Sequence, residues 1–436
     1  MERSRFGSLV LTFTVAYGAI TIGAGGCSSN NSPAGPGSGS AGRGGGGGVP
    51  SVGRGGAGGG GGIIGGAGTG GGVVGVGGAT GTGGQGQGCA LPAGPAGSWV
   101  EVAPPAGQDG FRVTDIFAVG ANDLLFAGRT FDPLSTAPAA NARVLRWTQG
   151  CWSVELMIPA STAAPDFVSV NGTGPGDIWA AGSDLLFHRD AQGWSRFSDE
   201  SWRGLVRQPP MFGEQLQFHR VRAAGANDLW AAVSSNILHW NGSSWTDYNF
   251  DDPGYPTISA SIGFGYRDIW IDSPTNVWVA GGSDEIGNTM DLGFVHHFDG
   301  TNWTHTSIGL SQVEAIWRGG SVLWLANPTQ AIINGQQMTA TMRAFDGTNA
   351  PAVTMIGMDP NNPPAMNSLF GRGASDIWAA GDDVAHFDGQ NWSLASDAPA
   401  AARSTNDEHN THVGGDAGSI WLATPGPHFF RKVTGP

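Results

Sequence analysis

Lysine is almost absent from this chain of 436 residues, in which Lys432 is the only one. Acidic residues outnumber basic ones by 35 to 21, the formal net charge is −14, and no run of basic residues occurs. Proteins that bind nucleic acid by counterion release carry clustered Lys and Arg. The charge balance therefore disfavours that class, and we expect no nucleic-acid partner.

Long hydrophobic runs are also lacking. Beyond residue 22, no apolar segment reaches the roughly 20 residues that a membrane-spanning helix needs. Aromatic residues are absent from residues 42–88, where 28 of the 47 positions are Gly. These glycines follow no three-residue period with Pro, which excludes collagen. Such a segment cannot bury enough apolar surface to fold, so we predict a disordered linker over residues 27–97.

The N-terminus has the zones of a secretory signal. Arg3 and Arg5 precede an apolar stretch over residues 9–22, and small residues follow up to Cys27. This order predicts a signal peptide over residues 1–26 rather than a membrane anchor. Small residues directly before a cysteine resemble the lipobox of bacterial lipoproteins, which implies that Cys27 becomes an acylated N-terminus. The alternative is ordinary cleavage near the same glycines, which leaves Cys27 a free thiol.

Seven copies of one unit fill residues 98–436. The clearest string is a short turn followed by an apolar strand, and its last residues lie 43 to 54 positions apart: Leu125, Trp179, Trp230, Trp278, Trp324, Trp378 and Trp421. A second string places Trp after a polar or Gly-rich turn, at Trp99, Trp152, Trp194, Trp245, Trp303 and Trp392, with Ala350 in a degenerate copy. Four short strands per unit at this period predict an all-β fold, a seven-bladed β-propeller of four-stranded antiparallel blades.

The register of the strings predicts how the ring closes. The last copy lacks its Trp strand, and a spare Trp strand at residues 98–102 precedes the first copy. We therefore predict that this N-terminal strand is the outermost strand of the last blade, which removes the open sheet edges. A β-sandwich would leave seven phased copies unexplained.

The strings themselves resemble known repeats. An apolar strand ending in Ala-Gly or Gly-Gly, as at Gly281 and Gly282, is followed by an aromatic-Asp-Gly turn and a Trp, as at residues 298–303. This pattern is similar to kelch-type propeller repeats and to the Trp-rich repeats of large bacterial surface lipoproteins. The resemblance covers residues 98–436. At the N-terminus, Ser28 directly after Cys27 resembles the outer-membrane sorting signal of Gram-negative lipoproteins. Together the two resemblances imply a protein of the outer membrane or cell surface that is held by a lipid anchor.

The histidines do not predict a metal site. Four of them lie six residues before a repeat Trp, and because one blade position repeats around a ring, their side chains are far apart. We expect them to bond neighbouring backbone: His188, His239, His297 and His386. His409 and His412 lie outside this set, and a metal site there is the alternative reading. Asp284, Glu285, Asn288 and Asp291 form an oxygen-rich loop that we interpret as a solvated turn rather than a calcium site. No cofactor is predicted.

Polar residues of the innermost strands are the ligand candidates, because these strands face the axis or mouth of a propeller. A ring of arginines there could grip an anion; the alternative is a solvated channel of paired charges. The candidates are Arg112, Arg222, Arg267, Asp268, Arg318, Arg372 and His412. The chain has only four Tyr, and no Tyr–Glu nucleophile pair or Ser-His-Asp order stands out, so no catalytic residue is assigned.

Two cysteines remain besides Cys27. Cys151 lies on the predicted outer strand of the first blade, and Cys89 shortly precedes the strand that closes the seventh. These blades are neighbours and an exported protein can oxidise its thiols, so we predict a Cys89–Cys151 bridge; the alternative is two separate thiols.

The sequence thus predicts a monomeric, non-catalytic lipoprotein of the cell envelope whose propeller binds a protein or glycan. The alternative is a glycan-active hydrolase or lyase with its site at the axial mouth.

Overall fold

A computed structural model describes the chain over residues 89–108, 110–130, 141–158, 167–206, 216–233, 236–248, 264–283, 293–309, 312–326, 331–333, 336–338, 342–347, 352–354, 364–403, 411–426 and 428–433. All of these belong to one compact unit, Val73–Pro436. Their only helices are two 3₁₀ turns, η1 (Ser201–Gly204) and η2 (Ala400–Ala402). No helix in these ranges has the length and apolarity that crossing a membrane requires. Cys27 and the predicted signal peptide lie outside the described residues.

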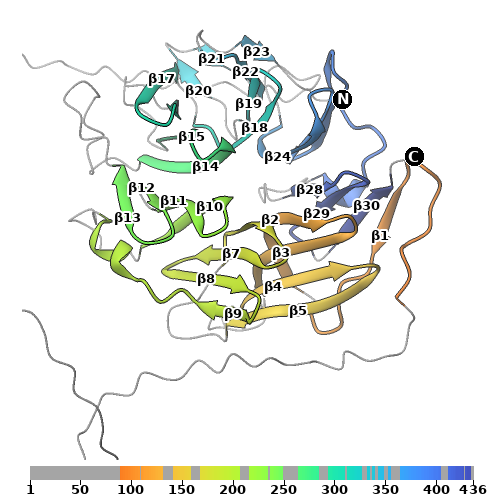
Figure 1. Ribbon diagram of the computed structural model, residues 1–436. Coiled ribbons are helices and arrows are strands. Elements are labelled where there is room, and N and C mark those ends of the chain that lie inside the picture. The colour runs from red at the N-terminus through yellow and green to blue at the C-terminus, as the bar shows by residue number, and fades with distance from the viewer. Residues whose placement is uncertain are drawn as a thin grey trace, which may run out of the picture. The chain divides into compact units, whose positions relative to one another are not determined.

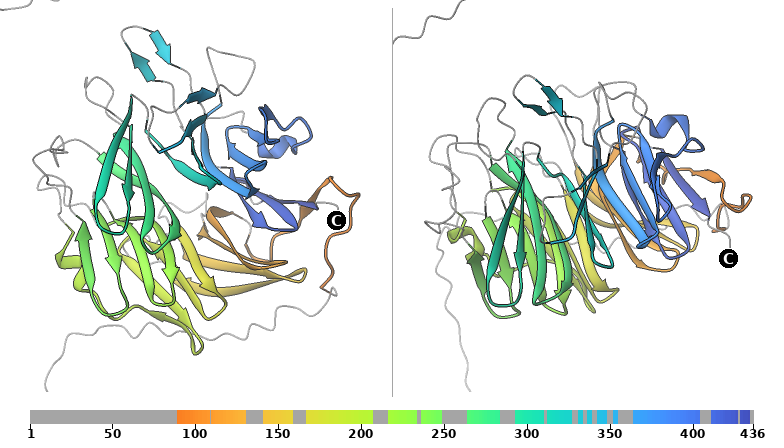
Figure 2. Two further views of the ribbon diagram at one scale, coloured as in Figure 1. Left: turned by 45° about the horizontal axis from the view of Figure 1, so that its top comes forward. Right: turned by 90° about the horizontal axis from the view of Figure 1, so that it is seen from above.

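Seven four-stranded antiparallel sheets stand around a common axis, which confirms the predicted seven-bladed propeller (Figures 1 and 2). From the axis outward, blade 1 consists of β2 (Phe111–Gly120), β3 (Asp123–Thr130), β4 (Asn141–Thr148) and β5 (Cys151–Ile158), and blade 2 of β6 (Ser169–Gly174), β7 (Asp177–Gly182), β8 (Leu185–Asp190) and β9 (Gly193–Arg196). Blade 3 consists of β10 (Phe218–Gly225), β11 (Asp228–Val233), β12 (Asn236–Trp240) and β13 (Trp245–Tyr248), and blade 4 of β14 (Phe264–Ser273), β15 (Asn276–Ser283), β16 (Gly293–Phe298) and β17 (Trp303–Gly309).

Blades 5 to 7 complete the ring. Blade 5 consists of β18 (Ala315–Gly319), β19 (Val322–Ala326), β22 (Met342–Phe345) and β23 (Ala352–Thr354). Blade 6 consists of β24 (Met366–Gly373), β25 (Asp376–Gly381), β26 (Val384–Phe387) and β27 (Trp392–Leu394), and blade 7 of β28 (His412–Asp416), β29 (Ser419–Ala423), β30 (Phe429–Val433) and β1 (Trp99–Val102). Each innermost strand contacts the innermost strands of its two neighbours, and β28 contacts β2. A short hairpin of β20 (Ala331–Ile333) and β21 (Gln336–Met338) in blade 5 was not predicted.

The N-terminal strand closes the last blade, as the register of the repeats predicts. β1 pairs antiparallel with β30, from Trp99 opposite Lys432 to Val102 opposite Phe429. The indole of Trp99 meets the edge of Trp378 in blade 6, with ring centroids 5.7 Å apart. The first and last strands of the propeller sequence are thus paired in one sheet, and β1 covers the edge of β30 that would otherwise be unpaired.

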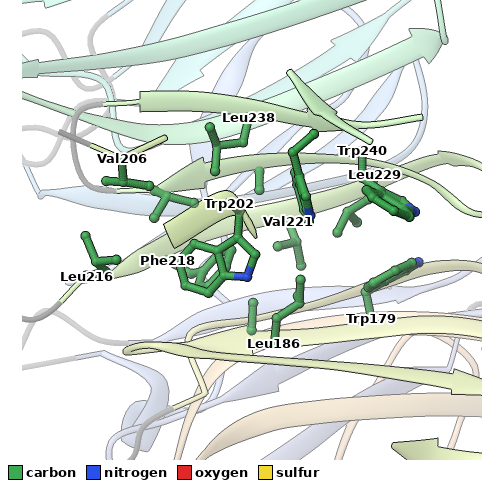
Figure 3. Packing of buried hydrophobic residues seen from close by; sticks show 14 residues of the cluster. Trp179, Leu186, Trp202, Val206, Leu216, Phe218, Val221, Leu229, Leu238 and Trp240 are labelled. Carbon is green, nitrogen blue, oxygen red and sulfur yellow. The ribbon is translucent and has the colours of Figure 1, made fainter. Parts of the chain in front are cut away.

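The core consists of apolar layers between neighbouring blades. Every residue of β7 is buried, because a middle strand has a blade on each side, and such strands are apolar without alternation. Figure 3 shows the layer between blades 2 and 3, where Trp179 and Leu186 face Leu229 and Trp240. Trp202 of η1 is fully buried in the same layer. The repeated Trp residues therefore stabilise contacts between blades rather than a single central core.

Small residues follow the apolar strands because the backbone of the innermost strand lies close. A Cβ atom on Gly281 would come within 2.1 Å of the carbonyl oxygen of Gly265. Gly128 and Gly381 occupy similar places in blades 1 and 6, where the corresponding distances to the carbonyl oxygens of Arg112 and Ala365 are 2.0 and 2.2 Å. The Ala-Gly and Gly-Gly endings thus allow neighbouring strands to approach.

The four repeat histidines bond side chains, so the prediction that they bond backbone is wrong. In blade 2, Nε2 of His188 lies 2.8 Å from Oδ1 of Asp177, and its ring stacks on Trp179 with centroids 4.0 Å apart. The reason is register: Trp179 lies opposite His188, and Asp177 is two residues away on the same face of the strand. The same carboxylate or amide partners occur for His239 (Asp228), His297 (Asn276) and His386 (Asp376).

Cys89 and Cys151 are joined as a disulfide, with Cα atoms 5.0 Å apart. The bridge links the segment before β1 to β5 of blade 1. We expect replacing both cysteines by Ser to lower the free energy of unfolding by about 2–4 kcal/mol, because the bridge restricts the unfolded chain. Denaturant unfolding of the oxidised protein and the double variant measures this difference. Recovery of both thiols unpaired by non-reducing peptide mapping of the purified protein would contradict the bridge.

Candidate functional site

A cavity of about 240 Å³ lies on the propeller axis. Its volume is several times the ~30 Å³ that one water molecule occupies in the liquid. The lining comes from all seven blades, near the beginnings of the innermost strands: Thr114, Val168, His219, Arg220, Arg267, Glu314, Asn367 and His412. The cavity therefore opens at the end of the ring where these strands start.

One blade position supplies a layer of residues that includes two of the cavity residues, Arg220 and His412. Each of its residues pairs with an Ala of the second strand; the residues are Asp115, Ser169, Arg220, Asp268, Ala315, Ser368 and His412. In blades 1, 3, 4 and 6, the register shifts by one residue just before this position, as in a β-bulge. A β-bulge changes the direction in which a side chain points. In blade 3, where the bulge contains His219, both His219 and Arg220 line the cavity.

Side chains of this layer bond the backbone of the next blade. The Asp115 carboxylate accepts a hydrogen bond from the amide of Val170 at 3.0 Å, and the Asp268 carboxylate accepts one from the amide of Ile316 at 2.9 Å. Ser368 does the same through its hydroxyl, which accepts from the amide of Val413 at 3.1 Å. These bonds fasten neighbouring innermost strands, so the layer has a structural role.

Two arginines of β10 join the two carboxylates across the axis. Arg220 lies 3.2 Å from Asp115 and 2.9 Å from Asp268, and Arg222 lies 3.5 and 3.3 Å from the same two residues. Residues of blades 1, 3 and 4 thus share one network of two positive and two negative charges. The network is electrically balanced, and one of its members, Arg220, lines the cavity.

The network shifts the pKa of two of its members, Asp115 and Arg220. Burial raises the pKa of Asp115, but the charges of Arg220 and Arg222, together with the hydrogen bonds from Val170 and Ser169, outweigh it, and the pKa lies below its ordinary value. Burial likewise lowers the pKa of Arg220, but the attraction of Asp268 and Asp115 raises it above the usual value. Asp115 is therefore ionised at neutral pH and cannot serve there as a general acid.

Two imidazoles of the lining have no hydrogen-bond partner among the described residues: His219 and His412. Burial lowers the pKa of His219 to about 4, and the nearby charges of Arg267 and Arg220 act in the same direction. Burial also lowers the pKa of His412 to about 4; Asp115 opposes this effect and Arg220 adds to it. Both rings are neutral at pH 7, so each offers one N–H donor and one nitrogen acceptor to the cavity.

These imidazoles predict a loss of stability in mild acid. Because their pKa is lower in the folded protein than the ordinary 6.5, the unfolded chain binds more protons between pH 6.5 and 4. The free energy of unfolding should fall over that range, by up to about 2 kcal/mol for each ring at pH 5. Denaturant unfolding between pH 8 and 5 measures this fall. The double variant His219→Gln, His412→Gln should have a flatter profile, and an unchanged slope would contradict the assignment.

The seven predicted ligand residues fall into four groups. Arg267 and His412 line the cavity, and Arg222 and Asp268 belong to the charge network. Arg318 and Arg372 form ion pairs with Asp272 and Asp376, near the turns that lead into the second strands. Arg112 lies in β2 opposite Arg129. The predicted set therefore does not meet at one point.

Sequence reasoning missed His219 and Arg220. β10 begins at Phe218, three residues before Val221, where the apolar pattern of this strand begins in the sequence. The feature that identifies Arg220 is its pairing with an Ala of the second strand. Arg220 lies opposite Ala232, just as Asp115 and Asp268 lie opposite an Ala in their own blades.

Comparison with known proteins supports the fold alone. No protein-family profile and no curated protein matches the sequence. Among solved structures, YCF48 bound to D1 peptide is similar with a TM-score of 0.51 at 14% identity, covering 79% of this chain and 99% of that one. Virginiamycin B lyase from Staphylococcus aureus has a TM-score of 0.51 at 10% identity, with coverage of 77% and 98%.

A third similar structure is PorZ of Porphyromonas gingivalis, described as a bacterial surface component of the type IX secretion system. Its TM-score is 0.50 at 12% identity, and the match covers 78% of this chain and 48% of PorZ. The three neighbours include a peptide complex and an enzyme, so the shared propeller does not choose between binding and catalysis.

Proposed function

We propose that this protein is a non-catalytic binding module of the cell envelope, whose propeller binds a protein or glycan ligand at the axial cavity. The observation that carries the proposal is the state of the axial carboxylates. Asp115 and Asp268 each accept backbone hydrogen bonds and each face two arginines. A cavity whose acids are engaged in this way can hold a ligand without transforming it.

The alternative is a glycan-active hydrolase or lyase. Glycoside hydrolysis commonly uses two carboxyl groups, of which one is protonated and the other is free to attack or to activate water. Asp115 is held ionised, and both carboxylates are bonded on more than one side. Glu314, which lines the cavity itself, lies 3.7 Å from Nε of Arg267. These contacts favour binding over that chemistry.

A ligand screen that also detects turnover tests the proposal. The full chain is incubated with glycan and peptide panels, and each bound compound is recovered and analysed by mass spectrometry. We expect bound ligand to be recovered intact, with binding weakened by Arg267→Ala and unaffected by Arg196→Ala, which changes an exposed arginine paired with Glu200. Product formation that Arg267→Ala abolishes would establish the enzyme instead.

The envelope location rests on residues 1–27 and the glycine-rich segment. The predicted signal peptide followed by Cys27 supports export and acylation, and a coil of the length of residues 28–88 would have a root-mean-square reach on the order of 45 Å. That reach suffices to hold a monomeric propeller away from a membrane. Mass spectrometry of the mature N-terminus should find an acylated Cys27. A mature end without acyl chains defeats the anchor but leaves the axial site as proposed.

A further inference from the structure

The charges around the axial cavity cancel in pairs, and this balance restricts the ligand. Arg220 and Arg222 are matched by Asp115 and Asp268, and Arg267 is matched by Glu314. An anionic ligand would have to displace a carboxylate from a guanidinium, and a cationic one would have to displace a guanidinium. Breaking the buried pairs of Arg220 with Asp115 and Asp268 is costly, so the balanced lining favours a neutral ligand.

The lining has a high density of hydrogen-bonding groups. Val168 is the only apolar side chain among the residues that the structure places around the cavity. The Thr114 hydroxyl is already used, since it donates to the backbone oxygen of Phe167 at 2.5 Å. His219 and His412 differ, because neither ring bonds the described protein. They come from blades 3 and 7, and each has a donor and an acceptor to offer.

From this lining we infer that the axial cavity holds one neutral saccharide unit of a glycan, with His219 and His412 as its hydrogen-bonding contacts. The inference rests on the proposed function and names the ligand class of the same site. Sugar hydroxyls both donate and accept, as a neutral imidazole does. A peptide side chain of similar volume carries fewer polar atoms and would leave more of this polar lining without a partner.

Titration calorimetry on the full chain in detergent tests the inference at pH 7. The probes are the neutral sugars methyl glucoside, methyl galactoside and N-acetylglucosamine, and the acidic sugars glucuronate and N-acetylneuraminate. We expect a neutral sugar to bind at least tenfold more tightly than the acidic ones. His219→Ala and His412→Ala should each weaken that binding about tenfold, because one hydrogen-bonding group is lost. His219→Gln and His412→Gln, which keep a donor and an acceptor, should recover part of it.

His428→Ala is the matched control. This histidine is half-exposed, pairs with Glu101 at 2.7 Å and does not line the cavity, so its loss should leave sugar binding unchanged. Near-ultraviolet circular dichroism establishes that each variant is folded.

The possible failures are distinguishable. Equal or tighter binding of the acidic sugars, or neutral-sugar binding unaffected by either axial His→Ala change, overturns the inference. A peptide that binds and is weakened by Arg267→Ala, while no sugar binds, overturns the inference and leaves the binding function standing. Conversion of a bound sugar overturns the proposed function itself.

Discussion

Asp268→Ala should destabilise the propeller by about 3–5 kcal/mol, the cost typical of removing one partner from a buried ion pair. Asp268 is 3% exposed, and both Arg220 and Arg222 face its carboxylate. The same carboxylate accepts the amide hydrogens of Ile269 and Ile316. The substitution therefore leaves two guanidinium groups with less compensation and two amides without their acceptor. The midpoint of denaturant unfolding measures the effect.

Asp397→Ala is the control for this experiment. Asp397 also carries one negative charge and pairs with Lys432 at 2.6 Å, but its side chain is 51% exposed. Exposed pairs contribute about 0–1 kcal/mol, so this change should hardly move the midpoint. Equal losses for Asp268→Ala and Asp397→Ala would show that the axial network does not stabilise the ring.

Removal of β1 should have the second large effect. Without residues 1–106, the edge of β30 is unpaired and Trp378 loses its contact with Trp99. We expect a loss of more than about 3 kcal/mol, comparable to truncating a large core side chain. We also expect association between molecules, because an exposed strand edge is a template for pairing. Thermal unfolding and light scattering after gel filtration measure the two effects.

A chain that lacks only residues 1–91 separates the strand from the disulfide. It has lost Cys89 but keeps β1, so the difference between the two truncated chains isolates the strand. We expect this control to remain monomeric. Equal thermal midpoints for the two chains would contradict the role of β1 in closing the ring.

The fold could be predicted because its causes repeat along the sequence. Seven phased Trp and turn strings specify the number of blades, and a spare Trp99 strand opposite a missing one specifies the closure. The partners of the repeat histidines were missed because they depend on register. His188 meets Asp177 only because Trp179 lies opposite His188 in the sheet. Periodicity places residues on strands, but it does not say which side chains meet across them.

The axial site could be predicted only in part for the same reason. Polar residues of innermost strands were recognised as candidates, and Arg267 and His412 do line the cavity. Arg318 and Arg372 lie on those strands too, but they pair with Asp272 and Asp376. The register shift before Arg220 brings His219 to the cavity as well, and no repeat in the sequence marks that shift. Distance along the innermost strand, not strand membership, decides which residues reach the cavity.

Nuclear magnetic resonance of the imidazole groups tests the central claim, ligand binding at the axial cavity, most directly. In the full chain labelled at histidine, a ligand identified by the panels is added at pH 7. We predict that the signals of His219 and His412 shift in proportion to occupancy, while those of His188, His239, His297 and His386, which are held by their side-chain partners, stay in place. Shifts confined to the four repeat histidines, with the signals of His219 and His412 unmoved at saturation, would contradict ligand binding at the axial cavity.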